Sequence, residues 1–153
     1  MRKSASRQLV AADTLGGEVA FFSIGTNDLV QYTLAVDRGN ANLNSRFTPL
    51  HPAVLRLIQT IARTAGDCGI EVAVCGEMAS HPLTAFALIG LGLRQLSVNA
   101  RAVPIVKRLV RGISVADAER AAQAALRALS AAEAEAVLRP PLIAALGTAA
   151  LDG

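Results

Sequence analysis

Short apolar runs alternate with longer amphipathic segments up to about residue 113. Continuous apolar runs are typical of buried strands, whereas apolar positions three and four residues apart predict helices. The strand–helix alternation favours parallel strands joined by right-handed crossovers, and therefore an α/β fold. The pattern predicts strands at residues 19–24, 70–74 and 95–98, and helices at residues 52–65, 82–89 and 103–111.

No strand pattern follows residue 113, and the sequence becomes rich in alanine. Ser114 with Asp117, and Ser130 with Glu133, form two capping-box patterns, each of which predicts the start of a helix. An Arg-Pro-Pro run follows at residues 139–141. Because proline disrupts the interior of a helix, we expect the second of these helices to end there.

Composition and charge narrow the class of protein. With 153 residues and 52% hydrophobic residues the chain can form one modest core. We expect its four phenylalanines, Phe21, Phe22, Phe47 and Phe86, to pack in that core. No apolar run reaches the roughly 20 residues of a membrane span, so we expect no membrane insertion. The net charge is +3, and the arginines are scattered without interleaved aromatic residues, so we expect no nucleic-acid partner.

The two cysteines bracket one of the predicted strands. If residues 70–74 are extended, Cys68 and Cys75 lie about 20 Å apart, which is too far for a disulfide. Two unpaired thiols fit the reducing cytoplasm, and we therefore expect a cytoplasmic protein.

Polar side chains follow each predicted strand. Asn27 and Asp28 follow the first, Cys75 and Glu77 the second, and Asn99 the third. In parallel α/β folds the carboxyl ends of the strands form the functional face, so these residues predict an active site. A carboxylate at a helix N-terminus can hold a metal ion, and free N–H groups there suit a phosphate. The alternative, which stays open, is that Asn27 and Asp28 simply cap the following helix.

Two stretches, "FFSIGTNDLVQYTLAVDRGN" and "VAVCGEMAS", resemble the phosphoenolpyruvate-utilising enzyme family. They are most similar to its enzyme I branch, the phosphoenolpyruvate-protein phosphotransferases of the bacterial sugar phosphotransferase system. The resemblance runs from about residue 10 to about residue 129. It implies that residues 1–113 form part of a phosphoenolpyruvate-binding (β/α)8 TIM barrel, about its last three units. Residues 114–153 would be C-terminal helices that pack on the same domain.

The resemblance also implies roles for the residues of the first stretch. Asp28 matches the aspartate that binds magnesium in the family, and Mg²⁺ prefers such hard oxygen ligands. Asn27 and Arg38 match two residues that hold the phosphate of the substrate. A guanidinium suits that task because its planar fork pairs with two phosphate oxygens.

In the second stretch Cys75 matches the acid that handles the proton at the methylene carbon as enolpyruvate becomes pyruvate. Gly76 and Glu77 match the motif around this cysteine, and we expect them to support it. The family transfers the phosphoryl group from phosphoenolpyruvate to a histidine in a separate N-terminal domain. A small histidine-containing phosphocarrier protein then receives it.

The chain departs from the family pattern at two positions. The second magnesium ligand of the family, a glutamate, would fall near Ser4, where no carboxylate is found. Ala20 stands where the family commonly has an acidic residue. The chain thus resembles a C-terminal fragment of an enzyme I, and we expect it to be inactive alone.

Two alternatives remain at this point. A non-catalytic dimerisation or assembly fragment is one, because the barrel domain of enzyme I also forms its dimer. A fragment of pyruvate phosphate dikinase or phosphoenolpyruvate synthase ranks below it. In either case three parallel strands leave open sheet edges, so we expect a homo-oligomer.

Overall fold

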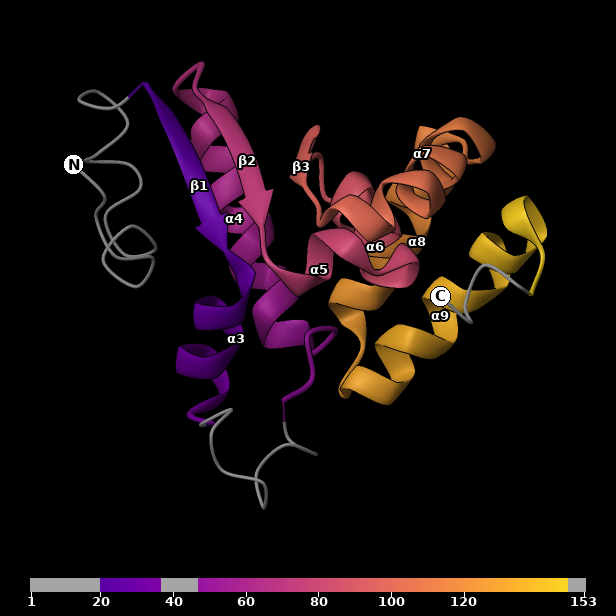
Figure 1. The fold of residues 1–153 in the computed structure, drawn as a ribbon. Helices are drawn as coiled ribbons and strands as arrows, with labels where there is room; N and C mark the ends of the chain where they lie inside the picture. The colour runs from indigo at the N-terminus through magenta and orange to yellow at the C-terminus, as the bar shows by residue number, and fades with distance from the viewer. Residues whose placement is uncertain (1–19, 37–46, 149–153) are drawn as a thin grey trace.

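The computed structural model describes residues 20–36 and 47–148. Its centre is an open sheet of three parallel strands in the order β1-β2-β3, with helices alternating between them (Figure 1). The elements, labelled as in Figure 1, are β1 (Phe21–Gly25), α3 (Thr26–Leu34), α4 (Pro52–Asp67), β2 (Glu71–Cys75), α5 (Glu77–Ser80), α6 (Pro82–Gly90), β3 (Gln95–Ser97), the 3-10 helix η2 (Ala100–Ala102), α7 (Val103–Gly112), α8 (Val115–Arg127) and α9 (Ala131–Leu146).

Hydrophobic periodicity therefore located the main elements, and the prediction of an α/β fold with C-terminal helices is confirmed. Residue 19, at the start of the first predicted strand, lies outside the described residues. The short helix α5 was not predicted, because four residues are too few to show a helical period. Within the described ranges no helix combines the length and apolarity that crossing a membrane requires.

The sheet has one buried face and one open face. Phe22 and Ile24 of β1 and Val74 of β2 are buried in the core. Phe21 and Ser23 alternate with them on β1 and are exposed, because successive side chains of a strand point to opposite faces. The expectation that Phe21 packs in the core is therefore wrong, since 61% of its surface is exposed.

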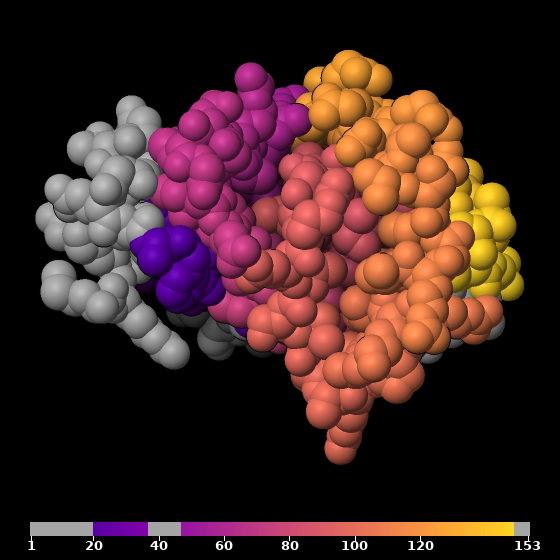
Figure 2. Space-filling view, turned by 90° about the horizontal axis from the view of Figure 1, so that it is seen from above, coloured from indigo at the N-terminus to yellow at the C-terminus, as the bar shows by residue number. Residues whose placement is uncertain are grey.

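Helix α6 is buried along its whole length, with α8 and α9 packed against it. Alanines of α8 make this possible, because Ala118, Ala122 and Ala125 let the two helices approach closely. At the closest point a Cβ added to Gly90 would lie only 2.1 Å from the carbonyl oxygen of Ala118. Figure 2 shows the packed molecule from above, with the colours running from indigo on one side to yellow on the other in the order of the sequence.

Helix α9 continues through the Arg-Pro-Pro run, so the prediction that it ends there is wrong. Pro140 and Pro141 lack the N–H groups that would bond to the carbonyls of Ala136 and Val137. Both of those residues are exposed, so water can satisfy the free carbonyls. Buried leucines hold the helix on both sides of the prolines; they are Leu138, Leu142 and Leu146.

Of the two predicted capping boxes, only the second caps its helix, and its glutamate accepts from the residue before the N-cap, Leu129, and not from the N-cap itself. The Ser130 hydroxyl accepts from Glu133 N at 3.2 Å, and the Glu133 carboxylate accepts from Leu129 N at 2.9 Å. At the start of α8 the Ser114 side chain makes no capping hydrogen bond. Asp117 pairs with Arg120 instead, which removes one half of the reciprocal arrangement.

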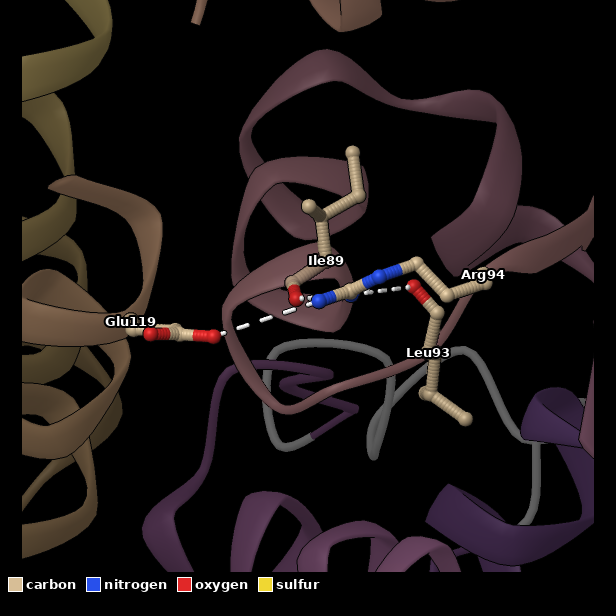
Figure 3. A network of polar contacts seen from close by, with 4 residues as sticks. All are labelled: Ile89, Leu93, Arg94 and Glu119. Carbon is tan, nitrogen blue, oxygen red and sulfur yellow. Dashed lines mark hydrogen bonds and ion pairs between the residues drawn. The ribbon is translucent and has the colours of Figure 1, made fainter. Parts of the chain in front are cut away.

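Three arginines donate to carbonyl groups at the ends of helices. Arg94 binds Ile89 O at 2.8 Å and Leu93 O at 3.0 Å, and it lies 3.9 Å from the Glu119 carboxylate of α8 (Figure 3). Arg56 of α4 holds Leu126 O of α8 through two nitrogens, and Arg108 of α7 holds Leu146 O of α9. Leu126 O and Leu146 O lie in the last turns of α8 and α9, where carbonyls lack an intrahelical partner, so Arg56 and Arg108 complete these two helix ends. Ile89 O, by contrast, also accepts from Gly92 N at 3.0 Å.

The contact between α6 and α8 leads to a test of the fold. We expect Gly90→Ala to destabilise the protein by about 2 kcal/mol or more, because the added methyl group meets backbone that cannot move aside. Gly66→Ala is the matched control. Gly66 lies in α4 with nothing within 4 Å of an added Cβ, so alanine there should stabilise by about 0.5–1 kcal/mol. Urea unfolding followed by circular dichroism measures both; equal stability of the two variants would contradict the observed helix packing.

Candidate functional site

The carboxyl ends of the three strands lie side by side. Gly25 pairs with Cys75, and Cys75 pairs with Ser97, so Cys75 occupies the middle of the row. Helix α3 begins directly after β1, and α5 begins one residue after β2. The structure therefore brings together the predicted site residues of the first two strands.

Gly76 is required where these two strands end. Its φ is 115°, in the region that favours glycine, and an added Cβ would lie 2.4 Å from the hydroxyl oxygen of Thr26. That hydroxyl is fully buried and donates to Cys75 O at 3.1 Å. The Gly76 position thus lets the start of α3 pack against the end of β2.

Asn27 connects the two motifs through its side chain. Its Oδ1 accepts a hydrogen bond from Glu77 N, the first N–H of α5, at 3.3 Å. Because only the oxygen of the amide can accept, the Asn27 NH₂ group points away from Glu77. That group donates no hydrogen bond to another described residue, so it can bind an acceptor at the strand ends.

Asp28 lies in the first turn of α3 and is exposed. Its carboxylate faces back toward the strand, since a Cβ added to Gly25 would lie 3.9 Å from Asp28 Oδ2. The alternative that Asn27 and Asp28 cap α3 is wrong as stated, because the N-cap residue is Gly25 and no side chain caps this helix. Both residues lie inside the first turn, where a negative charge is favourable and an anion can approach the free N–H groups.

The thiol of Cys75 is half-buried at the centre of the row. Its Sγ donates to Ile24 O at 3.5 Å and lies 3.8 Å from the Ser23 hydroxyl. This arrangement holds the thiol on the open face of the sheet, where a bound molecule can reach it. Cys68 is free and exposed, in agreement with the prediction that the two cysteines form no disulfide.

Other predicted positions fall elsewhere. Arg38 and Ser4 lie outside the described residues. The side-chain oxygen of Asn99 is engaged away from the site, because Asn99 Oδ1 accepts from Ala102 N at 2.8 Å and caps η2. Its backbone N–H donates to the Ser80 hydroxyl, which ties the end of β3 to α5.

Sequence reasoning missed Thr26 and Ser23. Thr26 supports the site from within, and Ser23 lies beside the thiol. Ser23 could have been found from the alternation of β1, because residues 21, 23 and 25 lie on the same face of the strand. Nothing in the local pattern distinguishes Thr26 from an ordinary residue at the start of a helix.

The donor set at the strand ends can be compared with the needs of metal ions. No cluster of three His, Cys, Asp or Glu side chains that could hold a metal occurs among residues 20–36 and 47–148. Asp28 supplies one carboxylate at the strand ends. Magnesium usually takes one or two protein carboxylates and completes its shell with water and substrate oxygens, so this arrangement fits Mg²⁺.

A hollow of about 620 Å³ lies beside α5 and is closed on its other side by the start of α9. Glu77 and Met78 line it from the site, and Glu135 and Arg139, which form an ion pair, line it from α9. His81 lies between these walls. Loss of water there lowers the pKa of His81 below the usual 6.5, the charge of Glu135 opposes this effect, and that of Arg139 adds to it.

Comparison with known proteins assigns the class to which this fold and site belong. A family model described as "PEP-utilising enzyme, PEP-binding domain" matches residues 5–115. The chain therefore belongs to the phosphoenolpyruvate-utilising enzyme family, as the two motifs predicted.

Individual relatives point to one branch of the family. A phosphoenolpyruvate-protein phosphotransferase of Haemophilus influenzae is 42% identical over 134 residues, which cover 88% of this chain and 23% of the relative. One from Priestia megaterium is 44% identical over 110 residues, 72% of this chain and 19% of the relative. An Escherichia coli protein named "Phosphoenolpyruvate-dependent phosphotransferase system" is 50% identical over 119 residues, 78% of this chain and 16% of the relative. The chain thus spans less than a quarter of each of these relatives.

The lowered pKa of His81 predicts a pH dependence of stability. As the pH is lowered through about 6.5, the unfolded chain binds a proton at this residue before the folded chain does. The free energy of unfolding therefore decreases as the pH is lowered. We expect the wild-type Tm to fall more than that of His81→Gln between about pH 7.5 and about pH 5. Differential scanning calorimetry measures the difference; His51 is present in both proteins and cancels. A wild-type Tm that falls no more than that of the variant would contradict the prediction.

Proposed function

We propose that the chain carries part of the phosphoenolpyruvate site of a phosphoenolpyruvate-protein phosphotransferase. The observation that carries this proposal is the hydrogen bond from Glu77 N to Asn27 Oδ1, which joins the two family motifs at the carboxyl ends of β1 and β2. Phosphoryl transfer depends mainly on positioning and charge neutralisation, and a rigid junction of this kind serves positioning.

The proposal includes the architecture around the site. We infer that β1, β2 and β3 belong to a (β/α)8 barrel and that their open face, with Phe21 and Ser23, points to its interior. The parallel order and the alternating helices support this inference. A boundary near residue 113, with residues 114–153 as helices on the same domain, stays a prediction.

In this site Asn27 and Arg38 bind the phosphate of the substrate, and Asp28 holds magnesium. The Asn27 NH₂ group is directed away from Glu77 and donates to a phosphate oxygen. Arg38 would pair with two further oxygens through its planar guanidinium. Magnesium, when bound, would neutralise negative charge on the phosphate.

Cys75 delivers a proton to carbon in the same reaction. The phosphoryl group leaves the enol oxygen for a histidine nitrogen of a separate domain, and the resulting enolate takes a proton at its methylene carbon from the Cys75 thiol. Pyruvate and a thiolate result, and solvent returns the proton to the thiolate. The thiol donates to Ile24 O at 3.5 Å, a contact that holds it at the strand ends.

The same proposal extends to partners and compartment. As the family resemblance implies, the phosphohistidine would pass its phosphoryl group to a small histidine-containing phosphocarrier protein. The reducing cytoplasm stays the expected compartment, in which Cys68 and Cys75 remain free.

The role of Cys75 can be tested in a chimera. The matched segment of the Haemophilus influenzae relative is replaced by this chain, and pyruvate release from phosphoenolpyruvate is followed with Mg²⁺. We expect Cys75→Ala to lower kcat by about 10²–10⁴-fold with little change in KM, because proton transfer by a positioned side chain typically accelerates a reaction by this factor.

Cys68→Ala is the control, since it removes the other free thiol, which is exposed. It should leave both constants unchanged. A rise in KM with kcat intact for Cys75→Ala would make the thiol a binding group. An equal loss in the two variants would remove the proposed role altogether.

A second function, assembly without catalysis, is favoured by the exposed apolar side chains of Phe21 on β1 and Tyr32 on α3, and by the open edges of the sheet. Phe21 is 61% exposed and Tyr32 is 66% exposed, and β1 and β3 each pair on one side only within the described residues. Open edges and apolar patches promote pairing with other chains.

We therefore expect the 153-residue chain to self-associate at micromolar concentration in sedimentation equilibrium. The double variant Phe21→Lys/Tyr32→Lys should weaken this association, because it places charge at two exposed apolar positions, one of them on an edge strand. Leu129→Lys is the matched control, since Leu129 is 85% exposed in the connection between α8 and α9. A wild-type monomer of 15.8 kDa with a cooperative melt would refute the prediction.

A further inference from the structure

A concave surface far along the chain from the candidate site carries only positive charge. It measures about 540 Å³ and lies between the end of α7 and the end of α9. Lys107, Arg108 and Arg111 line it from α7, and Ala145 and Leu146 line it from α9. We call this surface the basic hollow. None of its lining residues belongs to β1, β2 or α5, so it is separate from the strand ends.

The sequence of α7 directs all three cations to one side of the helix. At about 100° per residue, positions 107, 108 and 111 fall within an arc of about 100°. Val106 and Leu109 occupy the opposite side and are buried in the protein. Burial of the apolar side therefore presents the cations together on the surface.

The floor of the basic hollow is held in place by two contacts. Arg108 donates to Leu146 O at 3.0 Å, which completes the C-terminal end of α9. Gly112 allows α9 to lie close, because a Cβ there would be 2.5 Å from Leu146 Cδ2. These two contacts fix the end of α9 against α7 at the floor of the basic hollow.

No carboxylate among the described residues balances these charges. The ion pairs found there join Arg94 to Glu119, Arg120 to Asp117 and Arg139 to Glu135. Lys107 and Arg111 make no hydrogen bond or ion pair within the described ranges. Like charges three or four residues apart on a helix repel each other.

The helix dipole of α7 favours only one of these two cations. Arg111 lies in the last turn of α7, where a cation is favoured by the free carbonyls. Lys107 lies one turn earlier, and the dipole effect falls off beyond the last turn. An anion that contacts both side chains would relieve their repulsion and use donors that have no partner among residues 20–36 and 47–148.

We propose that the basic hollow binds a small anion with two or more negative charges, such as a diphosphate group or a tricarboxylate. The Arg111 guanidinium presents a planar fork that pairs with two oxygens, and Lys107 adds a compact charge beside it. The volume lies within the range of small-molecule sites. The lining contains no aromatic side chain on which a base could stack, which disfavours single-stranded nucleic acid as the ligand.

Isothermal titration calorimetry of the 153-residue chain tests the proposal, with pyrophosphate and citrate as the two probes at constant ionic strength. We expect saturable binding of at least one probe, weakened about tenfold or more in Lys107→Gln/Arg111→Gln, because the charge-assisted bonds are lost. The same weakening should appear in the Asn27→Ala background, since Asn27 belongs to the strand-end site. The stronger probe shows whether phosphate or carboxylate is preferred.

The matched control is Arg63→Gln/Arg127→Gln, which removes the same two charges from exposed positions of α4 and α8. This variant should bind the probe as the wild type does. Absence of saturable binding to the wild type at millimolar concentration would overturn the proposal. Equal weakening in the two double variants would also overturn it, because net charge alone would then explain the binding. Loss of binding in Asn27→Ala with retention in Lys107→Gln/Arg111→Gln would place the anion at the strand ends and not in the basic hollow.

Discussion

The close contact between Gly76 and Thr26 is the constraint on which the strand-end site depends. The Thr26 hydroxyl occupies the space that a side chain at position 76 would need, and from there it donates to Cys75 O. Asn27 follows Thr26 and reaches across to Glu77 N. One missing methyl group therefore allows the first turn of α3 to lie against the end of β2, and the thiol, the amide and the carboxylate come together as a result.

Arginine side chains perform a corresponding task on the helical side of the molecule. Arg56, Arg94 and Arg108 each bind carbonyl groups at the end of a helix, and two of them join different helices. A guanidinium can do this because it offers several donors in a fixed plane. Three of the 15 Lys and Arg residues of the chain thus contribute to structure in this way. Lys107 and Arg111 differ, because no such carbonyl engages them in the described residues.

Periodic patterns predicted most of the fold, and contacts between distant residues account for the differences. The strand and helix positions follow from local alternation, and Ser130 caps its helix as its motif predicts. Pro140 failed as a stop signal because leucines of α9 are anchored in the core on both sides of it. At the site, Cys75 and Asp28 could be proposed from motifs. The link from Asn27 to the next βα unit could not, because it depends on how two strands pair.

The strand order has a consequence for how the chain folds. Phe21 pairs with Glu71 and Ala73 with Gln95, so neighbours in the sheet are also consecutive strands of the sequence. Each strand can dock on an edge that earlier residues have already formed, without waiting for a distant segment. Domains emerge from the ribosome N-terminus first, and contacts between near segments cost less loop-closure entropy. This sheet can therefore grow in the direction of synthesis, one βα unit after another.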